Sequence, residues 1–305
     1  MREWIVGAAA KAAPFVFVVL WSTGFIGARL TMPYAEPMTF LSLRFGVAAA
    51  LMWAMSLILR LPWPKDRATI LHTAIAGLLI HGVYLGGVFV AVREGLEAGA
   101  AALIVGAQPI VTAVFAGAIL GETVSLRKWT GLALGGLGVI VFVAEKLSEG
   151  LGTFSGVAYC ALALVAIAGG TVYQKRFVGS VSILPAAAFQ YAVSAVACFW
   201  FAMTFETGHI VWSSSFVFGF AWLTLVLSIG AVSLFYALIR RGEATNVASL
   251  FFLVPPCAAL IAWPLFGETL GPFAMAGMAL VAIGVFLVNR SAGRTDRPVN
   301  AKGAA

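Results

Sequence analysis

The sequence predicts an all-α integral membrane protein with ten transmembrane helices, arranged as two five-helix repeats of inverted topology. Of its 305 residues, 62% are hydrophobic and only 10% are charged, whereas soluble domains average about 45–50% apolar and about 25% charged residues. Ten apolar segments are long enough to cross a bilayer, and the two halves of the chain match at a constant offset. A water-soluble globule cannot bury this much apolar surface. The composition therefore excludes a cytosolic enzyme, a secreted disulfide-bonded domain, a disordered regulator and a nucleic-acid-binding protein.

The ten predicted spans come from windows of about 20 apolar residues, the length that crosses a hydrocarbon core of about 30 Å as a helix. The runs are continuously apolar, whereas the strands of a membrane β-barrel alternate in polarity. In order, the spans are residues 13–32, 37–59, 68–92, 98–120, 128–144, 153–174, 183–205, 214–239, 244–266 and 271–289. Turn-forming residues support the breaks between them, at Pro33 and Pro37, Pro62 and Pro64, Gly150 and Gly152, Gly208, and Gly267 with Pro272.

The distribution of basic residues predicts the orientation of these spans. Fifteen of the 19 Lys and Arg residues fall on the side that holds both termini, three fall on the other side, and Arg44 lies within a span. Positively charged loops stay in the cytoplasm, so we expect a multi-pass membrane protein with both termini cytoplasmic. The expected parts are a cytoplasmic N-terminus (1–12), a first repeat (13–146), a second repeat (147–289) and a cytoplasmic C-terminal tail (290–305).

An internal repeat appears when the chain is shifted against itself by 146 residues. The tripeptide Gly121-Glu122-Thr123 returns as Gly267-Glu268-Thr269, Pro109 matches Pro255, and Gly131 and Gly138 match Gly277 and Gly284. Each copy holds five spans, and five is an odd number, so the copies enter the membrane from opposite sides. Inverted repeats of this kind are shared by many secondary transporters, in which they support alternating access to a midplane site.

Three motifs occur in a characteristic order. They are Leu20-Trp21-Ser22-Thr23-Gly24-Phe25 with Arg29 in the first span, Arg44-Phe45 after Pro37 in the second, and Gln108-Pro109 followed by Gly121-Glu122 in the fourth. Together they resemble the drug/metabolite transporter superfamily of the EamA type, over residues 13–289. Within it, the sequence is most similar to bacterial exporters of amino acids, particularly aromatic ones. The second half departs from the pattern, because Ala168-Gly169-Gly170 replaces the Trp motif and Arg44 has no basic counterpart. The resemblance therefore implies an asymmetric transport site.

The substrate is expected to contact aromatic and polar side chains near the middle of several spans. His81 and Tyr84 are three residues apart and share a helix face, while Gln108 offers a neutral amide. For each candidate, helix packing or an internal hydrogen bond is the simpler alternative. The predicted substrate-binding residues are Trp21, Ser22, Thr23, His81, Tyr84, Gln108, Tyr173, Phe235, Tyr236 and Phe251.

A second group is expected to act in structure or gating, namely Arg44, Pro109, Glu122, Pro255 and Glu268. Arg44 lies about 10 Å inside its span, where a cation is a functional candidate. We expect it to bond helix-end carbonyls or an acid such as Glu94 or Glu97; snorkelling to the interface and contact with a substrate carboxylate are the alternatives. Glu122 and Glu268 follow glycines at helix ends and are predicted as caps or gate elements.

No Lys and no carboxylate lies deep in any span, which disfavours phosphorylated substrates and cationic drugs. A neutral or zwitterionic, partly apolar solute such as an amino acid fits better, exported by rocking of spans three–four and eight–nine. Multidrug or other metabolite efflux by proton antiport is the alternative function. An intramembrane enzyme is disfavoured because no catalytic pair or metal-binding motif is present. No cofactor or metal is expected; the expected partners are the substrate and the lipid bilayer, for a monomer or weak homodimer.

Overall fold

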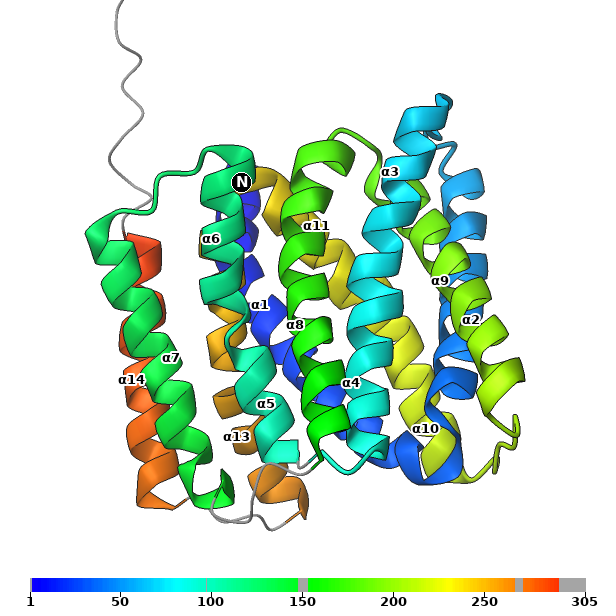
Figure 1. Cartoon of the computed structure of the whole chain (residues 1–305). Helices are drawn as coiled ribbons and strands as arrows, with labels where there is room; N and C mark the ends of the chain where they lie inside the picture. The colour runs from blue at the N-terminus through cyan, green and yellow to red at the C-terminus, as the bar shows by residue number, and fades with distance from the viewer. Residues whose placement is uncertain (1, 97, 148–152, 267–270, 291–305) are drawn as a thin grey trace, which may run out of the picture.

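The computed structural model describes residues 2–96, 98–147, 153–266 and 271–290. Within these ranges, ten helical segments are long and apolar enough to cross a membrane, which confirms the predicted number of spans. They form one bundle of alternating direction, and the chain starts at the upper end of Figure 1. We call this end the upper end and the opposite one the lower end. The sole β contact in the described ranges is a bridge between Ala35 and Ile210 at the lower end.

The first five spans divide into helical elements as follows. They are α1 (Arg2–Thr31) with η1 (Met32–Tyr34); α2 (Pro37–Ile58); α3 (Arg67–Gly77), η2 (Leu78–Val83) and α4 (Tyr84–Arg93); α5 (Ala98–Gly106) and α6 (Gln108–Leu120); and α7 (Leu126–Leu147). The second five spans are α8 (Phe154–Tyr173) with η3 (Gln174–Val178); α9 (Ile183–Phe205); α10 (Ser214–Trp222), η4 (Leu223–Ala231) and α11 (Val232–Arg241); α12 (Ala244–Ser249), η5 (Leu250–Leu253) and α13 (Val254–Phe266); and α14 (Pro272–Arg290).

Short polar side chains start several of these helices. The side chains of Asp66, Thr153 and Ser213 each accept a hydrogen bond from the backbone amide three residues later, at the starts of α3, α8 and α10. Such N-caps satisfy amides that have no partner inside the helix. At its other end, α6 stops at Gly121, whose φ of 67° suits glycine. The loop that follows carries Glu122 back across the upper end.

The repeat is visible in the backbone as well as in the sequence. Spans three and eight both contain π-helical turns, η2 and η4. Adding the offset of 146 to η2 gives residues 224–229, which lie inside η4. The fourth span breaks at Ala107 and the ninth passes through the 3₁₀ segment η5, which ends at the equivalent position, Leu253. Because π-turns are rare and often mark functional sites, their recurrence at equivalent positions points to the middle of these two spans.

Two helix pairs form the edges of the bundle, α7 with α14 and α2 with α9, and the other six spans lie between them (Figure 1). Each pair joins repeat-equivalent spans. Glycines allow α7 and α14 to touch: a Cβ placed on Gly138 would lie 2.9 Å from the carbonyl oxygen of Gly277, and one on Gly284 would lie 2.6 Å from that of Gly131. Small residues at a helix contact let two backbones approach closely. The predicted packing of the fifth span on the tenth is therefore present.

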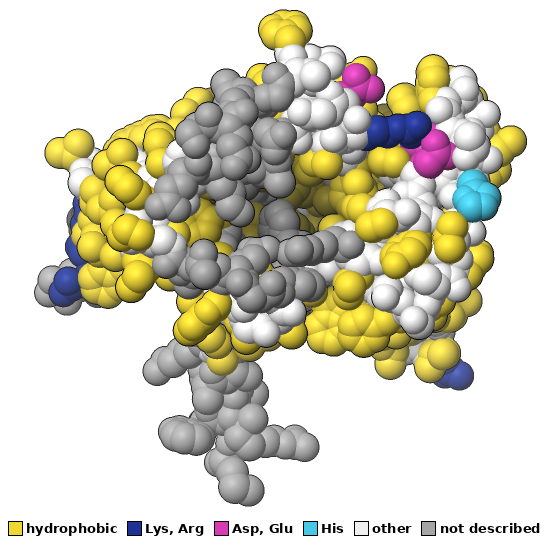
Figure 2. Space-filling model, turned by 90° about the horizontal axis from the view of Figure 1, so that it is seen from below, with side chains coloured by type: hydrophobic (Ala, Val, Ile, Leu, Met, Phe, Trp, Pro, Cys, Tyr) yellow, Lys and Arg dark blue, Asp and Glu magenta, His cyan; other side chains and the backbone are white. Residues whose placement is uncertain are grey.

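The two ends of the central six spans differ. At the upper end, α12 packs against α6. At the lower end, the repeat-equivalent elements are α13 and α5, and no comparable packing joins them within the described part of the chain. Figure 2 shows the lower face hollowed near its centre, with hydrophobic side chains on the walls of the hollow. In the described part of the chain, the packing between the two repeats is thus closer at this upper contact than at the equivalent place below.

Candidate functional site

An aromatic cluster forms where α1, α11 and η5 meet. Trp21 lies 5.2 Å from Phe251 and 5.7 Å from Phe235 between ring centroids, so three of the predicted residues come together. Phe17 completes the cluster, stacked on Phe235 at 5.6 Å. The sequence analysis did not single out Phe17, although its place one helical turn before Trp21 could have identified it.

The hydroxyl groups of the two residues that follow Trp21 form hydrogen bonds within the protein. Ser22 Oγ lies 2.7 Å from the carbonyl oxygen of Val18 and 3.2 Å from that of Val254, which links α1 to α13. Thr23 Oγ1 accepts a hydrogen bond from the indole Nε1 of Trp222 at 2.9 Å, which links α1 to α10. These contacts give both residues a role in packing, and their contact with substrate stays a prediction.

A chain of buried polar side chains crosses four spans inside the bundle. His81 Nε2 lies 3.0 Å from Tyr236 Oη. Tyr236 donates to Gln190 Oε1 at 2.6 Å, and Gln190 donates in turn to Gln174 Oε1 at 2.7 Å. The ring of His81 also stacks on Tyr191 with centroids 4.1 Å apart. His81 and Tyr236 were predicted; Gln190 and Tyr191 were not.

A signal for Gln190 was nevertheless present in the sequence, since it lies 146 residues after Arg44 and is its repeat equivalent. Arg44 itself is buried, and its Nε donates to Ser228 Oγ in η4 at 3.1 Å. Its expected acidic partner Glu94 bonds Ser155 instead, at 3.3 Å, and Glu97 lies outside the described residues. The π-helical turn that carries Ser228 could not be foreseen from the sequence.

Gln108 begins α6 beside the buried Pro109, in the middle of the fourth span. It is fully buried, yet neither its Nε2 nor its Oε1 has a hydrogen-bond partner in the described structure. The same is true of the hydroxyl of Thr112, one helical turn further along the same face. Buried polar atoms are normally hydrogen-bonded, so this face of α6 has the capacity to bind a polar ligand or water.

The remaining predicted residues lie apart from these groups. Tyr84 is buried in α4 within the main hydrophobic core, and Pro255 lies in the first turn of α13. Tyr173 lies close to the upper end, where its hydroxyl is 2.6 Å from Nδ1 of His72. Within the described ranges, no group of three His, Cys, Asp or Glu side chains could hold a metal ion.

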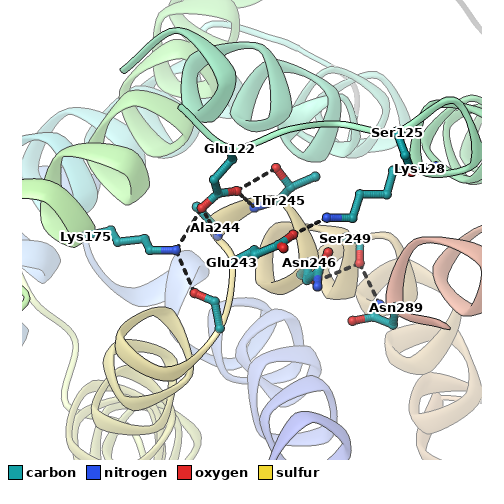
Figure 3. A network of polar contacts seen from close by, with 11 residues as sticks. Glu122, Ser125, Lys128, Lys175, Glu243, Ala244, Thr245, Asn246, Ser249 and Asn289 are labelled. Atoms are coloured by element: carbon teal, nitrogen blue, oxygen red, sulfur yellow. Dashed lines mark hydrogen bonds and ion pairs between the residues drawn. The ribbon is translucent and has the colours of Figure 1, made fainter. Parts of the chain in front are cut away.

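Glu122 organises a polar network at the upper end (Figure 3). Its carboxylate accepts hydrogen bonds from Lys175 Nζ at 2.8 Å, from the Ala244 amide at 2.8 Å and from the Thr245 hydroxyl at 3.1 Å. Lys175 Nζ also donates to the carbonyl oxygen of Gly242 at 2.8 Å. We call these five residues the Glu122 network. It joins the ends of spans four, six and eight to the start of span nine.

The charge of Glu122 is stabilised by these contacts. Burial opposes ionisation, but the hydrogen bonds from Lys175 and from the Ala244 amide outweigh it and lower the pKa of the Glu122 carboxyl. Beside the network, Lys128 pairs with Glu243, which ties the start of α7 to the same region. Glu268, the repeat equivalent of Glu122, lies outside the described residues.

Acidic residues at the lower end hold different elements together. The Glu206 carboxylate accepts hydrogen bonds from the amides of Met38 and Thr39, at 2.8 and 2.7 Å, and so fixes the start of α2 to the end of α9. Arg93 bridges Glu206 and Glu36 at 3.3 and 3.0 Å. These contacts stabilise the α2–α9 edge of the bundle.

The family of the chain is given by its similarity to known sequences. The EamA-like transporter family matches twice, over residues 11–144 and again over residues 154–290. The chain belongs to the EamA-like transporter family. Each match covers five spans, in agreement with the inverted repeat.

Several relatives are similar along nearly their whole length. The "Uncharacterized inner membrane transporter YedA" of Escherichia coli is 27% identical over 90% of this chain and 89% of its own. The "Probable amino-acid metabolite efflux pump" of Salmonella typhimurium is 27% identical over 88% and 91%. The "Probable terminal-alkyne amino-acid exporter" of Streptantibioticus cattleyicolor is 29% identical over 92% and 89%. A crystal structure with 18% sequence identity covers 94% of this chain with a TM-score of 0.79 and shows the same fold.

These similarities agree with the resemblance to the drug/metabolite transporter superfamily. The EamA-like protein is a multi-pass inner-membrane transporter, and its family and relatives are transporters rather than enzymes. Two of the named relatives carry amino-acid metabolites or amino acids in their names.

Proposed function

We propose that this EamA-like protein exports amino acids or closely related small zwitterions, with a preference for aromatic side chains, by alternating access. The observation that carries the proposal is the difference between the two ends. The Glu122 network and the packing of α6 on α12 join the two repeats at the upper end, while the lower face is hollowed near its centre. Since the basic loops predict a cytoplasmic upper end, we assign this arrangement to the outward-facing state of the proposed cycle.

The chemistry of the central spans supports the substrate class. The aromatic cluster around Trp21 offers apolar ring faces, and the His81–Tyr236–Gln190 chain offers neutral hydrogen-bonding groups. Neither group contains a carboxylate, so a large organic cation has no counter-ion there. The names of two relatives, an amino-acid metabolite efflux pump and an amino-acid exporter, support the same class.

The inverted repeat provides the conformational change. Two halves of the same architecture can exchange conformations, so that the closed end opens and the open end closes. In this proposal, spans three–four and eight–nine rock against the rest, and the π-turns η2 and η4 form the joints. The halves divide at residues 146 and 147, and the protein acts as a monomer or a weak homodimer with both termini in the cytoplasm.

Uptake of labelled phenylalanine into proteoliposomes tests the proposal, with empty liposomes as control and with and without a pH gradient. Saturable uptake that unlabelled amino acids inhibit is expected. Uptake without a gradient would indicate a facilitator, and uptake that needs a gradient would indicate proton coupling. Folded protein that takes up neither phenylalanine nor any other amino acid would refute the proposed substrate class.

A further inference from the structure

Arg44 is a deeply placed cation that has no acidic partner among the described residues. Its side chain lies seven residues inside α2 and its residue is only 5% exposed. A guanidinium carries five N–H donors, of which the structure uses the one on Nε, for Ser228. The four donors on the two terminal nitrogens have no hydrogen-bond acceptor in the described part of the chain.

The described acids cannot supply the missing negative charge, because all of them lie in loops or at helix ends. Glu122 and Glu243 belong to the upper end, and Glu36 and Glu206 to the lower end, each with other partners. Removing one partner of a buried ion pair is strongly destabilising. A buried guanidinium with no acid beside it in the described part of the chain is therefore suited to an anion that arrives from outside the protein.

The surroundings of Arg44 also suit an organic ligand. The guanidinium carbon lies 5.9 Å from the centroid of the Phe45 ring, and that ring lies 5.8 Å from His81 and 5.4 Å from Tyr191. Tyr191 donates to the backbone carbonyl of Ser228 at 3.2 Å, which keeps the tyrosine beside the residue that holds Arg44 Nε. A cation thus adjoins a wall of three rings.

In the second repeat, the residue at the position equivalent to Arg44 has hydrogen-bond partners within the protein. Gln190 is the repeat equivalent of Arg44, and its amide is bonded on both sides, by Tyr236 and to Gln174. The fold accommodates a neutral, fully bonded side chain at this place. A positive charge with unused donors is therefore not a requirement of the architecture.

We propose that the terminal N–H groups of Arg44 bind the carboxylate of the transported solute. This rests on the proposed function and makes it more specific, because it assigns a specificity-determining residue to one group of the substrate. Two parallel hydrogen bonds from a guanidinium recognise a carboxylate. They do not recognise a carboxamide, or a compound in which a hydrogen atom replaces the carboxylate. The structural role expected for Arg44 from the sequence is then limited to the hydrogen bond from its Nε to Ser228.

The wild-type protein provides the first test, in which inhibitors compete with labelled phenylalanine for uptake into proteoliposomes. Unlabelled phenylalanine, phenylalaninamide and 2-phenylethylamine share the ring and the amine, and phenylalanine alone has the carboxylate. We expect the half-inhibiting concentrations of the amide and the amine to exceed that of phenylalanine by about 10–100-fold, the factor typical of a charge-assisted hydrogen bond. Equal inhibition by the three compounds would overturn the assignment.

Variants connect that discrimination to Arg44. In Arg44→Gln the ratio should fall close to one, and in Arg44→Lys it should fall partway. In Trp53→Ala, a control on the same helix whose ring is exposed and packs on Trp63, it should stay high. A folded Arg44→Gln protein with an unchanged ratio would overturn the assignment. If that variant does not fold, Arg44→Lys and the wild-type comparison decide. Absence of any amino-acid transport in the wild type would instead refute the proposed function.

Discussion

The Glu122 carboxylate lies 2.8 Å from the ammonium group of Lys175 at the upper end of the bundle. The same carboxylate accepts the amide of Ala244, the first residue of α12. One side chain in the loop after α6 therefore holds two spans of the second repeat. If the bundle opens at this end, these bonds must break.

The first prediction concerns access from the upper end. In Glu122→Gln the charge-assisted bonds are lost, each worth about 1.5–3 kcal/mol, so the upper end should open more often. A Thr112→Cys reporter, placed in a chain without Cys160, Cys198 and Cys257, should react about 10-fold faster with an impermeant maleimide applied to that side. Glu94→Gln, a change at the lower end, is the matched control. An unchanged reaction rate would show that Glu122 does not keep this end closed.

The second prediction concerns pH. The folded protein lowers the pKa of Glu122 below its ordinary value of 4.5, so the ionised carboxylate contributes its full stability above that value. This contribution is lost as the pH falls through the lowered pKa of the folded state. The melting temperature should therefore fall as the pH is taken below about 4.5, and it should fall less in Glu122→Gln.

Glu36 also contributes to the fall of the melting temperature at low pH, in the same direction as Glu122. The hydrogen bond from the Thr207 side chain, with help from Arg93, lowers the pKa of the Glu36 carboxyl as well. The comparison is therefore best made in a Glu36→Gln background, from pH 7 to pH 3.5. Parallel curves with and without Glu122 would contradict the prediction.

The third prediction concerns the contact of α7 with α14. In Gly138→Ala the new methyl group would lie 2.6 Å from the backbone nitrogen of Val281, so the two helices must move apart. Overpacking of this kind costs about 1–3 kcal/mol and should lower the melting temperature in detergent. Gly46→Ala is the control, because a Cβ at Gly46 meets no atom within 4 Å and alanine favours a helix. Equal effects of the two variants would contradict close packing at Gly138.

The fourth prediction concerns the aromatic cluster. In Trp21→Ala the ring that contacts both Phe235 and Phe251 is removed, so the KM for phenylalanine should rise by about 10-fold, as expected for a lost aromatic contact and its buried area. Transport of alanine should change less. Trp53→Ala is the control, because Trp53 is exposed and packs on Trp63 away from the cluster. An equal loss for both amino acids would point to damaged packing.

Much of this architecture follows from the sequence, because spans are set by hydrophobic length and the repeat by identity at one offset. Ten runs of apolar residues predicted ten spans, and the glycines of the fifth and tenth spans predicted their packing. The contact partners of individual side chains could not be predicted in this way, since they depend on how the helices are rotated relative to one another. His81 was predicted as a substrate-binding residue, with an internal hydrogen bond as the alternative, but its partner Tyr236 is 155 residues away.

The π-turns could not be predicted either, because apolar segments have the same composition in α-helical and π-helical form. The turn η4 brings Ser228 to Arg44, and without it an acid seemed the natural partner. Glu122 was predicted as a cap or gate element from its place after Gly121. Its contacts with Lys175 and Ala244 come from the other repeat, and no local pattern encodes them.

The glycine contacts between α7 and α14 have a consequence for how the two halves can change. Gly131 contacts Gly284, and Gly138 contacts Gly277. Under the repeat offset, Gly277 is the equivalent of Gly131 and Gly284 is the equivalent of Gly138. Reciprocity of this form defines an isologous interface, the kind found in twofold homodimers. The chain thus contains, in covalent form, the interface of a symmetric pair. A substitution at any of the four glycines presses on the backbone of the opposite half, whereas Arg44 and Gln190, at equivalent places elsewhere, have been free to take different roles.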